Sequence, residues 1–119
     1  MNKRILIIDD NKDLLTMLTA MLKTKGYSIT VSETAENIIP VIKETKPDII
    51  MMDMLLSGSD GREICKQVKA DSSIASIPLM MLSAYPQAVS DCLKAGADAF
   101  IEKPFDMKIL LDKLASLHG

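Results

Sequence analysis

The chain has 119 residues, of which 48% are hydrophobic and 25% charged, and this balance fits one ordinary globular domain with its own core. A net charge of -2, with acidic and basic residues interspersed, provides no basic patch for DNA or RNA, so no direct nucleic-acid binding is expected. The longest apolar runs, at residues 5–8 and 49–52, are far shorter than the roughly 20 residues that cross a bilayer. We therefore expect no membrane partner and a cytoplasmic location.

The N-terminal part of the chain predicts a strand, a helix and a second strand. Residues 3–8 form an apolar run that ends at two acids, as expected of a strand buried on both faces. Apolar residues at helical spacing follow between positions 14 and 22, and Gly26 is expected to end that helix. Residues 28–31 then predict a weaker strand.

The next segment predicts a second helix and a third strand. Apolar residues at positions 35–42 share one side of a helix that stops before Pro47, and residues 48–52 form another continuous apolar strand. Pro40 lies inside the predicted helix, where a proline costs about 3 kcal/mol. We therefore expect a kink or a shortened helix at Pro40.

The remaining sequence continues the alternation to the end of the chain. A helix is predicted over residues 60–69, a strand over 77–82, a helix over 86–95, a strand over 97–101 and a helix over 107–117. Five repeats of strand and helix predict an α/β fold in which a parallel sheet is covered on both faces. We expect a single domain over residues 1–119.

Side chains capable of chemistry follow four of the five predicted strands. Asp9 and Asp10 follow the first strand, Asp53 the third and Ser83 the fourth, while the fifth runs into Lys103. Ligands of open parallel sheets bind beyond the carboxyl ends of the strands, so these side chains are expected to share one small volume.

Three crowded carboxylates predict a bound cation, because two of them at ~4 Å repel by about 4 kcal/mol near a protein surface. With only oxygen ligands nearby, Mg²⁺ is the expected ion. Lys103 adds a positive charge suited to phosphate, and the Ser83 hydroxyl can donate to a phosphoryl oxygen. The set indicates phosphoryl transfer to a carboxylate, with Asp53 as the expected nucleophile.

The order of these motifs resembles the receiver domains of bacterial response regulators over essentially the whole chain. The matching segments are Ile7-Ile8-Asp9-Asp10-Asn11, Ile50-Met51-Met52-Asp53-Met54 followed by Asp60-Gly61, Leu82-Ser83-Ala84, Ala95-Gly96-Ala97-Asp98-Ala99-Phe100, and Ile101-Glu102-Lys103-Pro104-Phe105. The resemblance implies a doubly wound, flavodoxin-like fold with five helices and the strand order 2-1-3-4-5. As the chain ends after its fifth helix, we expect a stand-alone receiver similar to the chemotaxis response regulator.

The resemblance also implies a role for each site residue. Asp53 is expected to be phosphorylated, and Mg²⁺ to be bound by the side chains of Asp10 and Asp53, by Asp9 mainly through water and by the backbone carbonyl of Leu55. Lys103 is expected to contact the phosphate, next to a cis Lys103-Pro104 bond. Ser83 and Phe100 are expected to form the switch pair, in which Ser83 moves toward the phosphate and the Phe100 ring rotates inward.

Three positions depart from the family pattern or modify it. Ser57 stands where the family usually has proline, four residues after Asp53, and predicts a looser loop. Leu55 and Tyr85 occupy positions that tune loss of the phosphate in this family. Their bulk predicts shielding from water and slow self-dephosphorylation.

The chain is expected to be a phosphorylation-gated binding module and not an enzyme. It would catalyse only its own phosphorylation and dephosphorylation. Its partners would be a histidine kinase or a histidine phosphotransfer protein and a downstream target that binds the last helix, the last strand and the helix before it.

A receiver-like scaffold independent of phosphate and a phosphotransfer intermediate remain alternatives. A phosphatase with an aspartyl intermediate needs a second acid two residues after its nucleophile, where this chain has Leu55. A flavin carrier is disfavoured by the absence of Trp and the presence of only two Tyr and two Phe.

Overall fold

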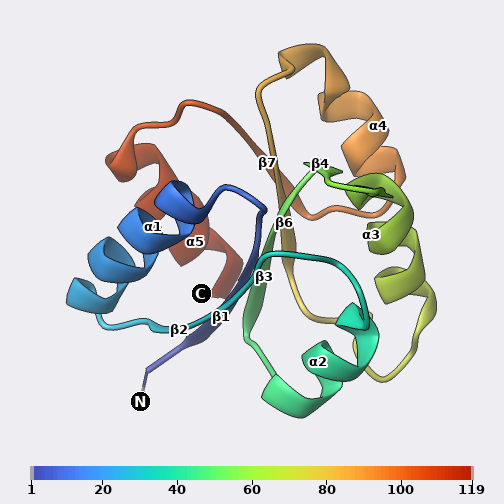
Figure 1. Ribbon diagram of the computed structural model, residues 1–119, viewed down its shortest axis with the longest axis horizontal. Helices are drawn as coiled ribbons and strands as arrows, with labels where there is room; N and C mark the ends of the chain where they lie inside the picture. The colour runs from blue at the N-terminus through green and yellow to red at the C-terminus, as the bar shows by residue number, and fades with distance from the viewer. Residues whose placement is uncertain (1, 119) are drawn as a thin grey trace.

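A computed structural model describes residues 2–118 and shows a five-stranded parallel sheet with helices on both faces (Figure 1). The sheet strands are β1 (Arg4–Ile8), β2 (Ser28–Ser32), β3 (Ile49–Asp53), β6 (Leu79–Ser83) and β7 (Ala99–Glu102). The α-helices are α1 (Lys12–Thr24), α2 (Ile38–Thr45), α3 (Gly61–Ala70), α4 (Val89–Lys94) and α5 (Met107–His118). The spatial order β2-β1-β3-β6-β7 is the predicted order 2-1-3-4-5 of the sheet strands, so the predicted fold is confirmed.

The three central strands are buried on both faces, which explains their nearly continuous apolar sequences. Successive residues of a strand point to opposite faces, so Leu6 and Ile8 pack on one side of the sheet and Ile5 and Ile7 on the other. One core lies under α2, α3 and α4, and the other under α1 and α5, as the two groups of helices in Figure 1 show. The two cores together fix the register of the central strands.

The direction in which the chain winds places the ends of β1 and β3 side by side. From β1 the chain moves outward to β2, then crosses back to β3 on the other side of β1. Ile8 is opposite Met52 in the parallel ladder, and Asp53 is opposite Leu82 of β6. The carboxyl ends of these strands meet at one edge of the sheet, which is the usual ligand-binding edge of an open α/β fold.

Pro40 is compatible with α2 because the helix begins three residues after the start of its apolar pattern and ends before Pro47. The helix begins at Ile38, so Pro40 lies in its first turn, where the backbone N–H groups have no intrahelical partner. The first bond of the helix runs from Val41 N to Asn37 O. Of the two predicted outcomes, a kink or a shortened helix, the structure has the shortened helix.

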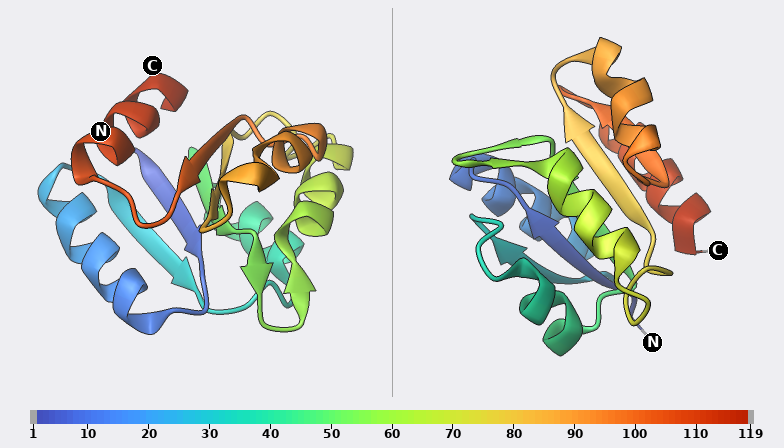
Figure 2. Two further views of the ribbon diagram at one scale, coloured as in Figure 1. Left: turned by 90° about the horizontal axis from the view of Figure 1, so that it is seen from above. Right: turned by 90° about the vertical axis from the view of Figure 1, so that its right-hand side faces the viewer.

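Two features of the fold differ from the sequence-based expectation. The predicted helix over residues 86–95 is a turn of 3-10 helix, η1 (Pro86–Ala88), followed by the short α4. Between β3 and α3 the chain forms a hairpin of β4 (Leu55–Leu56) and β5 (Ser59–Asp60), visible beside α3 in Figure 2. The bounds of α2 lie three residues beyond those of its apolar pattern, and the remaining bounds shift by at most two residues. Asp53 and Ser83 are thereby the last residues of their strands.

Within residues 2–118 no helix combines the length and the apolar character that a membrane span requires.

Candidate functional site

Three carboxylates converge at the carboxyl ends of β1 and β3. Asp9 and Asp10 directly follow β1, and Asp53 is the last residue of the neighbouring strand β3. One oxygen of each lies within 4.8 Å of the others. An all-oxygen set of this kind suits a hard cation such as Mg²⁺, and the donors present therefore fit the predicted ion.

Lys103 provides the positive charge of the cluster in the described residues 2–118. Its Nζ lies 2.7 Å from Asp9 Oδ2 and 3.3 Å from Asp53 Oδ1. The backbone N–H of Lys103 donates to the carbonyl oxygen of Ser83, and the following bond to Pro104 is cis, as predicted. Asp9 is 1% exposed, and its other oxygen accepts from Asn11 N at 2.9 Å. Asp9 is thus a buried anion that is paired on one oxygen and hydrogen-bonded on the other.

Asp10 differs from Asp9 because it is exposed and has no contact with Lys103 that is close enough for an ion pair. Ser57 in the hairpin turn donates to Asp10 Oδ2 twice, from its backbone N at 3.0 Å and from its hydroxyl at 2.8 Å. The hydroxyl bond is the main reason that the pKa of Asp10 lies below its usual value. The loop that was expected to be looser is therefore tied to Asp10.

Asp53 has the opposite electrostatic environment. Its side chain is largely buried, and desolvation raises the pKa of its carboxyl, while the charge of Lys103 acts in the other direction and Asp9 raises the pKa further. The ionised carboxylate of Asp53, which is the form that acts as a nucleophile, is thus only partly stabilised by the charge of Lys103. A divalent cation between the carboxylates would supply it.

The predicted switch residues lie on the two adjacent strands β6 and β7. Ser83 ends β6, is 2% exposed, and accepts a hydrogen bond on its hydroxyl oxygen from Tyr85 N at 3.0 Å. Phe100 is on β7, half-buried against the core under α2, α3 and α4. Leu55 begins β4 and is 49% exposed. The roles assigned to Ser83, Phe100 and Leu55 stay predictions.

Asp60 and Gly61 connect the β4–β5 hairpin to α3. The Asp60 side chain accepts from Arg62 N and caps the helix, while two further bonds from the Arg62 guanidinium hold the pKa of Asp60 below its usual value. Gly61 N donates to Met54 O, and a Cβ at Gly61 would lie 2.5 Å from the carbonyl oxygen of Asp53. Glycine thus lets α3 begin directly against the backbone that carries the predicted nucleophile.

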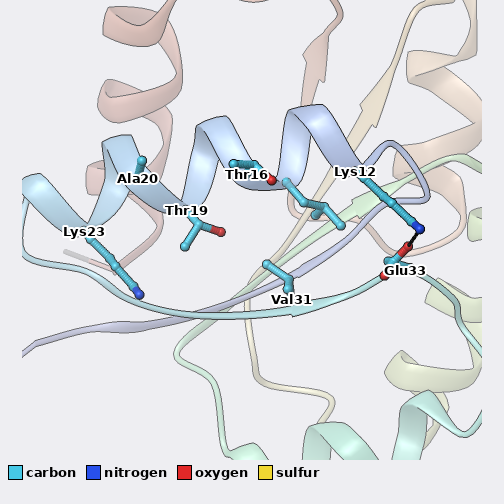
Figure 3. A pocket seen from close by; sticks show the side chains of 8 residues that line it. Lys12, Thr16, Thr19, Ala20, Lys23, Val31 and Glu33 are labelled. Carbon is cyan, nitrogen blue, oxygen red and sulfur yellow. Dashed lines mark ion pairs between the residues drawn. The ribbon is translucent and has the colours of Figure 1, made fainter.

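A separate groove lies between α1 and the edge strand β2 (Figure 3). Thr16, Thr19 and Val31 line it, and Lys12 and Glu33 pair across one end with 3.7 Å between Nζ and Oε1. Its lining includes a single acid, Glu33, and therefore no group of carboxylates. The chemistry of the described residues is therefore concentrated at the carboxylate cluster rather than in this groove.

Comparison with known proteins gives a consistent result. The response regulator receiver domain family matches residues 5–115. The DNA-binding response regulator MtrA of Mycobacterium tuberculosis is 34% identical over 116 residues, which are 96% of this chain and 50% of that protein. This chain thus spans half the length of that relative.

Solved structures agree with this assignment. A two-component response regulator from Clostridium difficile superposes with a TM-score of 0.88 at 30% identity, over 98% of this chain and 95% of that chain. The response regulator TrrA from Thermotoga maritima, solved in complex with Mg²⁺-BeF, has a TM-score of 0.86 at 27% identity, over 97% of this chain and 98% of that chain. The chain belongs to the response regulator receiver domain family.

Proposed function

Because the chain belongs to the receiver family, we propose that it is a phosphorylation-activated switch of a two-component phosphorelay, with Asp53 as the phospho-acceptor. The observation that carries the proposal is the cluster of Asp9, Asp10 and Asp53 within 4.8 Å, with Lys103 paired to two of its members. The donor is a phosphohistidine of a histidine kinase or a histidine phosphotransfer protein.

In the proposed transfer, an oxygen of Asp53 attacks the phosphorus atom of the phosphohistidine. A P–O bond forms as the P–N bond breaks, and the imidazole leaves with the electron pair of that bond and is neutralised by a proton. When bound, Mg²⁺ would supply positive charge for the transferring oxygens. The residues that would hold it are Asp9, Asp10, Asp53 and the backbone carbonyl of Leu55.

Lys103 and Ser83 assist the transfer from neighbouring strands. Lys103 already pairs with Asp53 and supplies a second positive charge for the phosphoryl group. Release of the Ser83 hydroxyl from Tyr85 N would let it donate to a phosphoryl oxygen. The transition state of phosphoryl transfer is loose, so charge placed in advance by such groups carries much of the rate.

The output is a change in a protein-binding surface. With Ser83 drawn to the phosphate, Phe100 on the adjacent strand rotates inward and alters the face formed by α4, β7 and α5, to which a downstream target protein binds. Phosphorylation biases a surface with two states rather than creating one. The chain catalyses its own phosphorylation and dephosphorylation and turns over no other substrate. We also propose that the chain acts in the cytoplasm.

The test is intact mass spectrometry after incubation with acetyl phosphate, with Mg²⁺ and with EDTA. The wild type is expected to gain one phosphoryl group only with Mg²⁺, and Asp53→Asn to gain none. Asp13→Asn, which alters an exposed carboxylate on α1, serves as the control and is expected to behave as the wild type. No gain by the wild type would favour a scaffold that is independent of phosphate.

A further inference from the structure

Ser57 connects the hairpin after Asp53 to the other side of the acidic cluster. Its backbone N–H and its hydroxyl both donate to Oδ2 of Asp10, at 3.0 and 2.8 Å. Among the described residues 2–118, no donor is hydrogen-bonded to the other oxygen, Oδ1. Asp10 is thus bound on one oxygen and leaves the second one open.

The hairpin keeps Ser57 in place. Ser57 and Gly58 form the two-residue turn between β4 and β5, and Gly58 has a φ of 75°, a conformation that favours glycine. Leu56 is opposite Ser59 in the ladder, and Gly61 N donates to Met54 O at the base of the hairpin. The β4–β5 ladder on both sides of the turn therefore fixes the position of the two Ser57 donors.

Two physical consequences favour cation binding by Asp10. An exposed carboxylate has rotational freedom that a bound ion must remove, and the two hydrogen bonds remove part of that freedom in advance. Mg²⁺ demands near-ideal octahedral geometry, so a ligand oxygen with a fixed position is worth more to it than to a tolerant ion.

We propose that Ser57 is a positioning residue for the divalent cation, which orients Asp10 through Oδ2 and leaves Oδ1 available as a ligand. The inference rests on the proposed function, because it assigns a residue to the same cation site. It concerns a position where the family pattern predicts proline, which has neither a hydroxyl nor a backbone N–H to donate. The paired hydrogen bonds are therefore a property of this chain's own sequence.

Four variants separate the two donors and control for the hairpin. Ser57→Ala removes the hydroxyl and keeps the N–H, Ser57→Thr keeps both, and Ser57→Pro removes both. Ser59→Ala removes a hydroxyl from the same hairpin, and no hydrogen bond of the Ser59 side chain occurs within residues 2–118. Mg²⁺ affinity is measured by isothermal titration calorimetry on EDTA-treated protein, and stability without Mg²⁺ by urea unfolding.

The wild type, Ser57→Thr and Ser59→Ala are expected to bind Mg²⁺ alike, and Ser57→Ala about three- to tenfold more weakly, as for the loss of one hydrogen bond. Ser57→Pro is expected to bind more weakly still. Loss of the hydroxyl bond also lowers the stability of Ser57→Ala without Mg²⁺ by about 0.5–1.5 kcal/mol. A merely structural role would lower this stability and leave the Mg²⁺ affinity at the wild-type value, so the affinity is the deciding measurement.

Equal or tighter Mg²⁺ binding by Ser57→Ala, with a wild type that binds, would overturn the inference, because Ser57 would then compete with the cation for Asp10. A Mg²⁺ affinity of Ser57→Thr as low as that of Ser57→Ala would overturn it as well. Absence of Mg²⁺ binding by the wild type would instead overturn the proposed cation site itself. The wild-type titration thus distinguishes the two failures.

Discussion

The ammonium group of Lys103 lies 2.7 Å from Oδ2 of Asp9, a carboxylate that is 1% exposed, and only 3.3 Å from Oδ1 of Asp53. Lys103 therefore balances a buried anion as well as standing next to the predicted nucleophile. In the absence of a divalent cation, this one side chain carries the charge balance of two acids whose strands are neighbours in the sheet.

Lys103→Met is expected to lower the free energy of unfolding on the order of 3 kcal/mol without Mg²⁺, because it leaves Asp9 buried and unpaired. Mg²⁺ should restore part of this loss by placing positive charge beside the same carboxylates. Urea unfolding with and without Mg²⁺ measures both effects. Lys12→Met is the control, since Lys12 is 79% exposed and its pair with Glu33 is expected to contribute less than about 1 kcal/mol. Equal losses in the two variants would contradict the assigned role of Lys103.

The raised pKa of Asp53 predicts that its contribution to the free energy of unfolding falls as pH rises. Burial raises the pKa of Asp53 above its ordinary value of 3.8, so the folded state binds a proton more strongly than the unfolded chain. Between 3.8 and the raised pKa the unfolded state releases its proton first, and stability decreases with pH across that window. Above the window, ionised Asp53 lowers stability by a constant amount.

Asp53→Asn removes this titration and is therefore expected to be more stable than the wild type at pH 7 in EDTA. The gain should shrink as the pH falls through the raised pKa and disappear below about 3.8. Urea unfolding from pH 3 to pH 8 measures the difference between the two proteins. Glu36→Gln, at an exposed acid in the loop before α2, should show no such pH-dependent gain. A constant difference between Asp53→Asn and the wild type at every pH would sink this prediction.

The ends of the central strands were predictable from the sequence because local chemistry marks them. In a sheet buried on both faces, an apolar run forms the buried strand, and the acid that follows it, as at Asp9 and Asp53, marks the strand end. The hairpin was not predicted, although Ser57-Gly58 is a turn signal, because strands of two residues have too little sequence to show a period. The bond of Ser57 to Asp10 joins positions 47 residues apart, and no local pattern encodes such a contact.

The segment from Ala95 to Phe100 illustrates a different limit. The resemblance to the family identifies this segment as a motif but gives Asp98 no physical role. In the structure, Asp98 Oδ2 accepts from Lys69 Nζ at 2.8 Å and from Leu79 N at 2.9 Å, and so ties α3 to the start of β6 and to the loop before β7. Asp98 therefore has a structural role, and its partner Lys69 is 29 residues away in the sequence.

Lys69→Met is expected to be strongly destabilising because three acceptors lose their donor. Lys69 Nζ donates to the carbonyl oxygens of Ala75 and Ile77 and to Asp98, and the Lys69 side chain is only 18% exposed. A loss of about 2–3 kcal/mol in urea unfolding is expected. Lys66→Met on the same helix is the control, because Lys66 is 59% exposed and pairs only with Glu63 within residues 2–118. Similar unfolding midpoints for the two variants would show that the Lys69 network contributes little.

Leu55 provides the last prediction, which concerns the lifetime of the phosphorylated state. Leu55 is two residues after Asp53 and 49% exposed at the start of the site hairpin, so its side chain can cover a phosphoryl group from water. An amide at this position would instead hydrogen-bond a water molecule near the phosphorus atom. Leu55→Asn is therefore expected to shorten the lifetime of phosphorylated Asp53 several-fold, measured by mass spectrometry after removal of acetyl phosphate.

Leu93→Asn is the matched control for this measurement, because Leu93 is 48% exposed on α4. Its phosphorylated lifetime should stay within about twofold of the wild type, as expected of a surface substitution that changes free energies by less than about 0.5 kcal/mol. A wild-type lifetime no longer than that of Leu55→Asn would contradict shielding by Leu55. Loss of the phosphoryl group would then be controlled by the charges around Asp53 and not by access of water, and Lys103 would be the next residue to vary.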